Sequence, residues 1–386
     1  MANPPTFYEF FAGAGMARAG LGAKWRCAFA NEFDLKKSVV YKKNWKANDT
    51  LKVADVGTLT TADVPDVADL VWASFPCQDL SLAGAGAGLK GDRSGTFWPF
   101  WRLMQGLIED DRAPALIVLE NVLGTLTSHE GKDFAAICST FVKAGYYFGA
   151  VVVDAVHFVP QSRPRLFVIG IRDDLALTAP NITAETSSAL WHPRGLLTAY
   201  DNLSAKVKDK WLWWNPPKPT QRKTTFADLI EDEPVGVEWH TASETAKLLK
   251  MMSDLNREKV NEAKASGQRM VGAVYKRTRR DEVGRKVQRA EIRFDDIAGC
   301  LRTPAGGSSR QVIVIVEGKT VRSRLISPRE TARLMGLPDS YALPTNYNEA
   351  YHLTGDGVAV PVVRHLSRHI FEPLLAALTP TARVAA

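Results

Sequence analysis

The stretch TFYEFFAGAGMARAGL, residues 6–21, decides the fold that this chain is expected to adopt. An apolar run of strand composition passes into small residues and then into a segment of helix composition. Gly13 and Gly15 allow the backbone to approach a ligand closely, and a helix that begins here offers free N–H groups to anionic or carboxylate-bearing ligands. We interpret the stretch as the first strand, turn and helix of an α/β protein that binds a nucleotide-like cofactor.

Two acids follow later apolar segments in the order that such a fold requires. Glu32 ends the segment RCAFANE, roughly twenty residues after the glycines, where doubly wound folds place a carboxylate that accepts from ribose hydroxyls. Asp55 follows the segment expected to be the third strand. Each acid alone is more often a solvated loop residue, so the order of the acids after the glycine turn carries the prediction.

The segment SFPCQDLSLAG, residues 74–84, places a cysteine directly after a proline. Residues 70–74 (LVWAS) are expected to form a short buried strand, and the chain turns at Pro76 because proline cannot extend a strand ladder. Cys77 is thereby placed as a nucleophile at the edge of the sheet. A free cysteine is otherwise commonly a small buried core residue.

A third acid follows the apolar run LIVLE, residues 116–120. The run predicts a buried strand that delivers Glu120 and Asn121 at its carboxyl end, the edge at which open α/β sheets bind ligands. A carboxyl group among apolar neighbours can serve as a proton donor near neutral pH.

Gln161, Arg163 and Arg165 stand at alternate positions before a further apolar strand. This alternation predicts that the three side chains lie on one face. Two arginines beside a thiolate would lower its pKa, and they could also hold a phosphate or a ring carbonyl. A solvated basic edge is the alternative.

In the order of its motifs the chain resembles the DNA cytosine carbon-5 methyltransferase family. The matching segments are FFAGAG (10–15), Glu32, Asp55, PCQ (76–78), GDRSGTFW (91–98), ENV (120–122), QSRPR (161–165), LISPRETARLMGLPDSY (325–341) and GDGVAVPV (355–362). The resemblance implies a doubly wound, mainly parallel α/β sheet of the class I S-adenosylmethionine-dependent, Rossmann-like type, with a smaller inserted domain. We expect the first part of the catalytic domain over residues 1–175, a target-recognition domain over 176–299, and the returning part of the catalytic domain over 300–386.

The resemblance also implies the reaction, a methyl transfer from S-adenosyl-L-methionine to carbon 5 of a cytosine flipped out of duplex DNA. Cys77 would add to carbon 6 while Glu120 protonates or hydrogen-bonds ring nitrogen 3. Arg165 would hold the cytosine carbonyl oxygen, and Arg163 would support the thiolate or an adjacent phosphate. Asn121 would orient the loop that carries the cysteine.

Two further sets of site residues are implied by the resemblance. The donor-binding set is Phe11, Gly13, Gly15, Glu32, Phe33, Asp55, Val56, Pro76, Phe97, Asp356 and Val358. The DNA-binding set is Gln78, Ser81, Arg93, Arg277, Arg279 and Arg280. The last three belong to a basic run where the family carries its recognition domain, and arginines there could read guanine edges or contact phosphates. A charge run is otherwise a solvated face.

Two residues depart from the family pattern. Glu9 stands where the family more often has aspartate, and Asp356 stands where it more often has asparagine. A second negative charge at Asp356 would repel the carboxylate of the donor unless a basic group intervenes.

Composition and cysteine usage limit the partners and the cellular compartment that this chain can be expected to have. The formal net charge of +7 agrees with a polyanionic partner. The four cysteines show no metal-ligand spacing, and Cys27 and Cys138 lie among apolar residues. We therefore expect no metal, no membrane segment and a cytoplasmic protein. The resemblance implies a bacterial or phage-encoded modification methyltransferase of the restriction-modification type, which we expect to be monomeric. The alternatives are a tRNA cytosine-5 methyltransferase of the same fold and an inactive DNA-binding relative.

Overall fold

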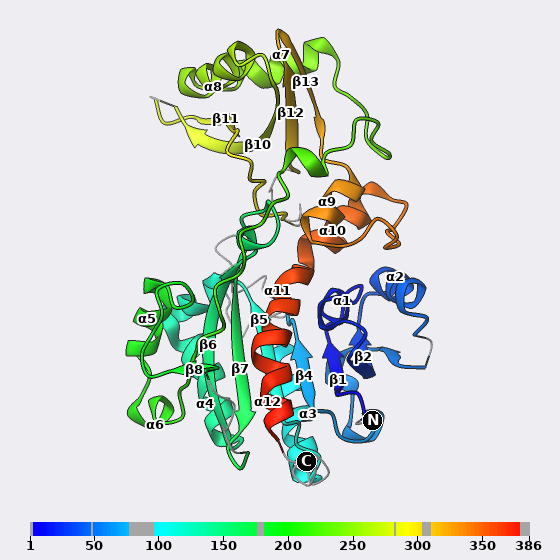
Figure 1. The fold of residues 1–386 in the computed structure, drawn as a ribbon, viewed down its shortest axis with the longest axis vertical. Helices are drawn as coiled ribbons and strands as arrows, with labels where there is room; N and C mark the ends of the chain where they lie inside the picture. Colours follow the sequence, from blue (N-terminus) through cyan, green and yellow to red (C-terminus); the bar gives the residue numbers. More distant parts are fainter. Residues whose placement is uncertain are drawn as a thin grey trace. The chain divides into compact units, whose positions relative to one another are not determined.

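The structure is a computed structural model that describes residues 3–47, 49–76, 96–175, 181–281, 283–302 and 310–378. These residues form two compact units, which are considered separately (Figure 1). Unit 1 takes its residues from 1–154, 164–220 and 358–386, and unit 2 takes its residues from 155–163 and 221–357.

Unit 1 is built on a seven-stranded sheet with the order β3-β2-β1-β4-β5-β7-β6. The strands are β1 (Thr6–Phe10), β2 (Arg26–Glu32), β3 (Leu51–Val53), β4 (Leu70–Ala73), β5 (Leu116–Asn121), β6 (Tyr146–Asp154) and β7 (Pro164–Arg172). The first five pair in parallel, and β7 is antiparallel to both β5 and β6. The strand order reverses at β1, and open α/β sheets bind ligands at the carboxyl ends of the strands beside such a reversal. The predicted doubly wound, mainly parallel fold is confirmed.

Helices cover both faces of this sheet, as its buried strands require. They are α1 (Met16–Leu21), α2 (Leu35–Trp45), α3 (Phe97–Glu109), α4 (Lys132–Lys143), α5 (Arg194–Asp201), α6 (Ala205–Lys208), α11 (Val360–Leu366) and α12 (Glu372–Ala377). On one face, Phe10 packs against Phe100 of α3 with ring centroids 5.2 Å apart. On the other, the ring of Trp72 lies 6.5 Å from that of Phe371, which precedes α12.

Unit 2 holds a four-stranded antiparallel sheet with the order β11-β10-β12-β13. Its strands are β10 (Arg269–Arg280), β11 (Lys286–Arg293), β12 (Val312–Glu317) and β13 (Thr320–Leu325), and its helices are α7 (Ala242–Lys250), α8 (Asp254–Ala265), α9 (Pro328–Leu334) and α10 (Tyr347–Asp356). Leu248, Val260 and Val314 belong to one buried cluster. Helices α7 and α8 therefore share a core with the sheet.

The compact units divide the chain at positions other than the expected domain boundaries. Residues 181–220 belong to unit 1, where β9 (Trp213–Trp214) pairs with β8 (Thr183–Ala184) and Leu212 N donates to Phe148 O of β6 at 2.7 Å. Residues 310–357 belong to unit 2, because β12 and β13 complete the sheet of β10 and β11. Pairing between distant segments sets these limits, and the function of each part stays a prediction.

Among the described residues, no helix combines the length and apolar character needed to cross a membrane. The same residues contain no group of three His, Cys, Asp or Glu side chains placed to hold a metal ion.

Candidate active site

The turn between β1 and α1 has a strained backbone and an open side. Phe11, Gly13 and Gly15 have φ of 55°, 56° and 84°. Among the described residues, a Cβ added to Gly13 would meet nothing within 4 Å, whereas one added to Gly15 would lie 2.2 Å from Nε1 of Trp45. Gly13 therefore borders open space, and Gly15 is required because α2 packs against it.

Glu32 and Asp55 lie together beside this turn. Glu32 is buried and accepts from Gly13 N at 2.6 Å through Oε2 and from Asp34 N at 2.8 Å through Oε1. Ala54 N donates to the carbonyl oxygen of Glu32 at 3.2 Å, which brings Asp55 next to it. Asp55 Oδ1 accepts from Gly57 N at 2.7 Å and so caps the short turn that follows.

Two apolar members of the donor-binding set flank these acids. Val56, which follows Asp55, is buried. Phe33, which follows Glu32, exposes 72% of its surface, an unusual state for so large an apolar side chain. An exposed ring next to a buried carboxylate is suited to stacking on a flat ligand.

The end of β4 is held by residues of β5 and α3. Nδ2 of Asn121 donates to the carbonyl oxygen of Phe75 at 3.2 Å, and its Oδ1 accepts from Val122 N at 2.8 Å. The ring of Phe75 lies 5.2 Å from that of Phe97, which is fully buried at the start of α3. The backbone immediately before Pro76 is therefore anchored on two sides.

Glu120 and Arg165 form an ion pair at the carboxyl end of β5. Nε of Arg165 lies 3.3 Å from Oε1 of Glu120, and the two side chains are 14% and 8% exposed. Antiparallel pairing of β5 with β7 brings them together, since Glu120 stands opposite Phe167. The carboxyl group of Glu120 therefore lies at the sheet edge beside a guanidinium group.

The prediction that Gln161, Arg163 and Arg165 share one face is wrong. Strand β7 begins only at Pro164, so strand alternation does not extend back to Gln161 and Arg163, which belong to unit 2. Arg163 is 1% exposed. Its guanidinium contacts Cys300 Sγ (3.4 Å) and the carbonyl oxygens of Leu301 (3.1 Å), Gly355 (2.7 Å) and Gly357 (2.5 Å). These bonds join two distant segments of unit 2, and the catalytic role expected for Arg163 stays a prediction.

The remaining predicted residues are distributed as follows. Cys77, Gln78, Ser81 and Arg93 lie outside the described residues. Asp356 is exposed at the end of α10 in unit 2, and Val358 is buried in unit 1.

The basic run forms the hairpin of β10 and β11. Arg277 Nε and Arg279 Nη2 approach the Glu291 carboxylate at 3.3 Å and 2.5 Å, and both arginines are 51% exposed. Arg280 Nη1 donates to Gly284 O at 2.9 Å. Arg277 and Arg279 share one acidic partner, so the hairpin surface keeps a net positive charge.

The sequence analysis missed two aromatic residues behind the glycine turn. Trp45 Nε1 donates to Ala14 O at 3.0 Å, and Tyr41 OH donates to the buried Glu9 carboxylate at 3.0 Å. Their spacing of four residues on α2, directed at the glycine turn, is the signal that could have revealed them.

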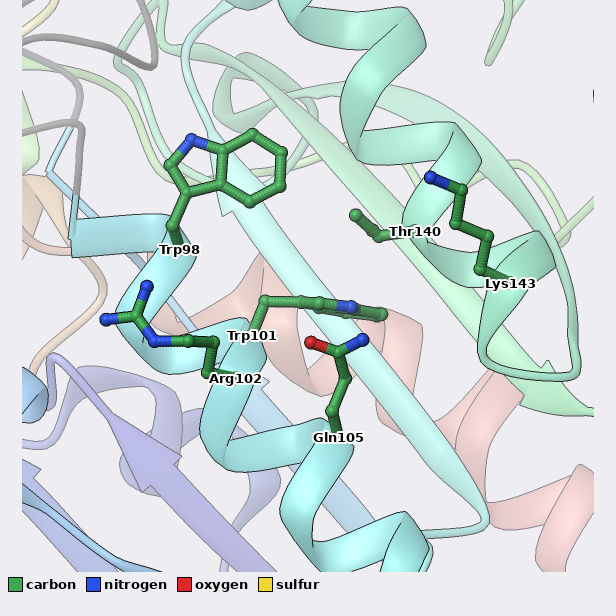
Figure 2. A pocket seen from close by; sticks show the side chains of 6 residues that line it. All are labelled: Trp98, Trp101, Arg102, Gln105, Thr140 and Lys143. Carbon is green, nitrogen blue, oxygen red and sulfur yellow. The ribbon is translucent and has the colours of Figure 1, made fainter.

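A pocket of about 290 Å³ lies over α3 and α4, and Figure 2 shows the side chains that line it. Its lining residues are Trp98, Trp101, Arg102, Gln105, Thr140 and Lys143. None of these belongs to the predicted site, although Trp101 stacks on Phe97 at 5.8 Å and Trp98 meets the same ring edge-on at 5.1 Å.

A family model described as C-5 cytosine-specific DNA methylase matches residues 5–372. The chain belongs to this family. Membership makes it a DNA cytosine-5 methyltransferase, as the motif order predicted.

Individual proteins agree with this assignment. The type II methyltransferase M.HpaII of Haemophilus parainfluenzae is 26% identical over 391 residues, which cover 96% of this chain and 90% of the relative. M.HhaI of Haemophilus parahaemolyticus, also a type II methyltransferase, is 26% identical over 370 residues, with 94% and 93% covered. The S. pombe Dnmt2 methyltransferase superposes with a TM-score of 0.60 at 16% identity (96% and 99% covered), and Entamoeba histolytica EhMeth with 0.63 at 13% (97% and 99%). These two structures share the fold.

Proposed function

We propose that the protein binds S-adenosylmethionine and transfers its methyl group to carbon 5 of a cytosine flipped out of duplex DNA, through a covalent bond between Cys77 and carbon 6. The proposal rests on the carboxyl end of β5, where the Glu120–Arg165 ion pair adjoins an asparagine that holds the start of the Pro76 loop. Glu120 and Asn121, which holds the backbone at the start of the cysteine loop, are thus adjacent residues of one strand.

Each residue has a defined part in the proposed reaction. The Cys77 thiolate adds to carbon 6 while the Glu120 carboxyl group gives a proton or hydrogen bond to ring nitrogen 3, which makes carbon 5 enamine-like. When bound, the donor supplies an electrophilic methyl group, which carbon 5 accepts. A water molecule takes the carbon-5 proton, Cys77 leaves carbon 6 as the thiolate, and any proton given to nitrogen 3 returns to Glu120, which restores the ring. Arg165 orients the Glu120 carboxyl group and donates to the cytosine carbonyl oxygen.

The turn after β1 fits a donor of this kind. Gly13 borders open space, so the methionine portion can pack closely against the backbone. Both Glu32 oxygens already accept one backbone N–H each, but a carboxylate has about four lone-pair sites and can also accept from ribose hydroxyls. The exposed ring of Phe33 and the Asp55 carboxylate are suited to the adenine.

We assign DNA recognition to unit 2, with the β10–β11 hairpin as a contact surface. The half-exposed side chains of Arg277 and Arg279 support this assignment, together with Arg280 at the end of the hairpin. Arg163 acts by positioning in this scheme, because it ties the backbone just before Val358 to residues 300–301.

Trapping on duplex DNA that contains 5-fluorocytosine tests the mechanism, because the fluorine blocks release of the adduct. The intact protein should form a stable adduct when the donor is present, and Cys77→Ser should form none. Cys138→Ala is the matched control, since Cys138 is fully buried in the core. Glu120→Gln should slow methylation about 10²–10⁴-fold.

Each opposite outcome has a definite meaning. An adduct on Cys77→Ser would refute the assignment of the nucleophile. Methylation of tRNA but not of duplex DNA, followed by bisulfite sequencing, would establish the tRNA alternative. DNA binding without methylation or adduct would identify an inactive relative.

A further inference from the structure

Glu9 is a buried acid beside the glycine turn, and the proposed chemistry gives it no part. It lies on β1 with 1% of its surface exposed. Its Oε1 accepts from Arg18 N at 3.2 Å, and its Oε2 accepts from Tyr41 OH at 3.0 Å. The carboxyl group therefore joins β1 to both α1 and α2.

The bond to Arg18 replaces a missing helix cap. Gly15 is the N-cap of α1 and has no side chain to accept from the first turn. Arg18 is the third residue of α1, and Glu9 takes its N–H from the adjacent strand. The residues between these two points, from Phe10 to Ala17, include the entire donor-binding turn. Glu9 thus links the strand before that turn to the helix after it.

Residues of α2 complete the support behind the turn. Arg18 Nη1 donates to Tyr41 OH at 3.3 Å, and its guanidinium carbon lies 4.9 Å from the Trp45 ring centroid. Trp45 in turn donates to Ala14 O, within the turn itself. A change at Glu9 therefore reaches the turn both through α1 and through α2.

The charged and titratable groups around Glu9 come from several elements. Arg18 of α1 and the Tyr41 hydroxyl of α2 favour the ionised carboxylate, and Glu32 of β2 opposes it. Cys27 of β2 lies 3.7 Å from Tyr41 OH, and burial raises its pKa to about 11. The strand neighbours paired with Glu9 are Ala30 and Trp72, which do not titrate. Burial dominates and raises the pKa of Glu9 to about 7.

Protonation must rearrange these contacts. A carboxylate can accept from Arg18 N and from Tyr41 OH together, whereas a neutral acid has an O–H that itself needs an acceptor. Tyr41 OH is placed to become that acceptor and to turn its own hydrogen toward Cys27 Sγ. The bond from Arg18 N then ends on an uncharged group and loses charge assistance.

We propose that Glu9 is a positioning residue whose ionised form holds the donor-binding turn, so that S-adenosylmethionine binds more tightly when Glu9 is ionised. This inference rests on the proposed function, since it concerns the donor assigned to that turn. Donor binding and proton release are therefore linked.

Calorimetric titration of the full chain with S-adenosylmethionine at a series of pH values tests the linkage. The dissociation constant should rise about fivefold to tenfold between about pH 8.5 and about pH 6, and binding near pH 7 should release protons in buffers of differing ionisation enthalpy. KM for the donor should follow the same profile, whereas kcat at saturating donor should not.

Two variants and one control test whether Glu9 is the group that causes the pH dependence. Glu9→Gln keeps the shape of the side chain but cannot ionise, so its affinity should not vary over this pH range. Tyr41→Phe removes a donor to the carboxylate and should move the midpoint to higher pH. Tyr146→Phe is the control, because it removes a buried hydroxyl that donates to Pro114 O and has no contact with Glu9. Its pH profile should match that of the parent.

If the parent protein binds the donor with an affinity that does not change with pH, or if Glu9→Gln shows the same pH profile as the parent, the inference is overturned while the donor assignment stands. If Glu9→Gln fails to fold, an unshifted midpoint in Tyr41→Phe would also overturn it. No donor binding at any pH would refute the donor assignment and this inference with it.

Discussion

Replacement of Gly13 and of Gly15 by alanine should have opposite consequences, although both glycines have positive φ and lie two residues apart. At each site the left-handed backbone alone costs an alanine about 1–2 kcal/mol. At Gly15 the new Cβ would also lie 2.2 Å from Trp45 Nε1 and 2.9 Å from Tyr41 Cε2, and such overpacking adds about 1–3 kcal/mol. Gly15→Ala should therefore lower the free energy of unfolding by about 2–5 kcal/mol. Gly13→Ala should lower it only by the about 1–2 kcal/mol that the left-handed backbone costs.

Donor binding should show the reverse pattern. A methyl group on Gly13 projects into the open space assigned to the donor, so the affinity of Gly13→Ala for S-adenosylmethionine should fall about tenfold or more. Urea denaturation and calorimetric titration of both variants measure the two effects. In Gly15→Ala combined with Trp45→Ala, the total loss of stability should be smaller than the sum of the single losses.

Equal losses of stability in the two variants would show that the contact with Trp45 does not constrain Gly15. Undiminished donor affinity in a folded Gly13→Ala would remove the donor from this turn. Because the two variants share backbone strain, neither result can be attributed to strain alone.

Three further predictions concern other parts of the chain. Burial raises the pKa of Glu9 in the folded protein to about 7, above the value of 4.5 that is usual for a free glutamate. The free energy of unfolding should therefore decrease by about 3 kcal/mol as pH rises between these values, and Glu9→Gln should abolish that decrease in urea titrations. Arg324→Met leaves the fully buried Glu330 without its ion-pair partner and should cost about 3–5 kcal/mol in the same assay, whereas a cost under about 1 kcal/mol would contradict this. Arg280→Ala should weaken binding to all DNA sequences and lower the salt slope by about one if it contacts a phosphate, as salt-dependent binding would show.

Several site elements were predictable because they depend on neighbours in sequence. The strand expected over residues 116–120 is β5, and Glu120 and Asn121 lie at its end. Glu32 ends β2, as the segment RCAFANE predicted, and its carboxylate accepts from Gly13 N of the glycine turn. Short apolar runs and glycines report local backbone geometry, and parallel pairing then brings strand ends to one edge.

Other features depend on partners far along the chain. Strand periodicity placed Arg163 with Arg165, yet the acceptors of Arg163 lie more than a hundred residues later, at residues 300–301 and 355–357. From the sequence, Glu9 was noted only as a departure from a family pattern. In the structure it is buried and accepts hydrogen bonds from residues of α1 and α2.

The sequence by itself determined the family, the doubly wound sheet and the identity of the acids at its edge, because these are written in contiguous motifs and their order. Tertiary structure alone decided which groups are buried and paired: the Glu120–Arg165 contact, the limits of the two units, and the proton equilibrium of Glu9. Desolvation and pairing act through space, and no local pattern reports which distant side chain or carbonyl will supply the compensating charge or hydrogen bond.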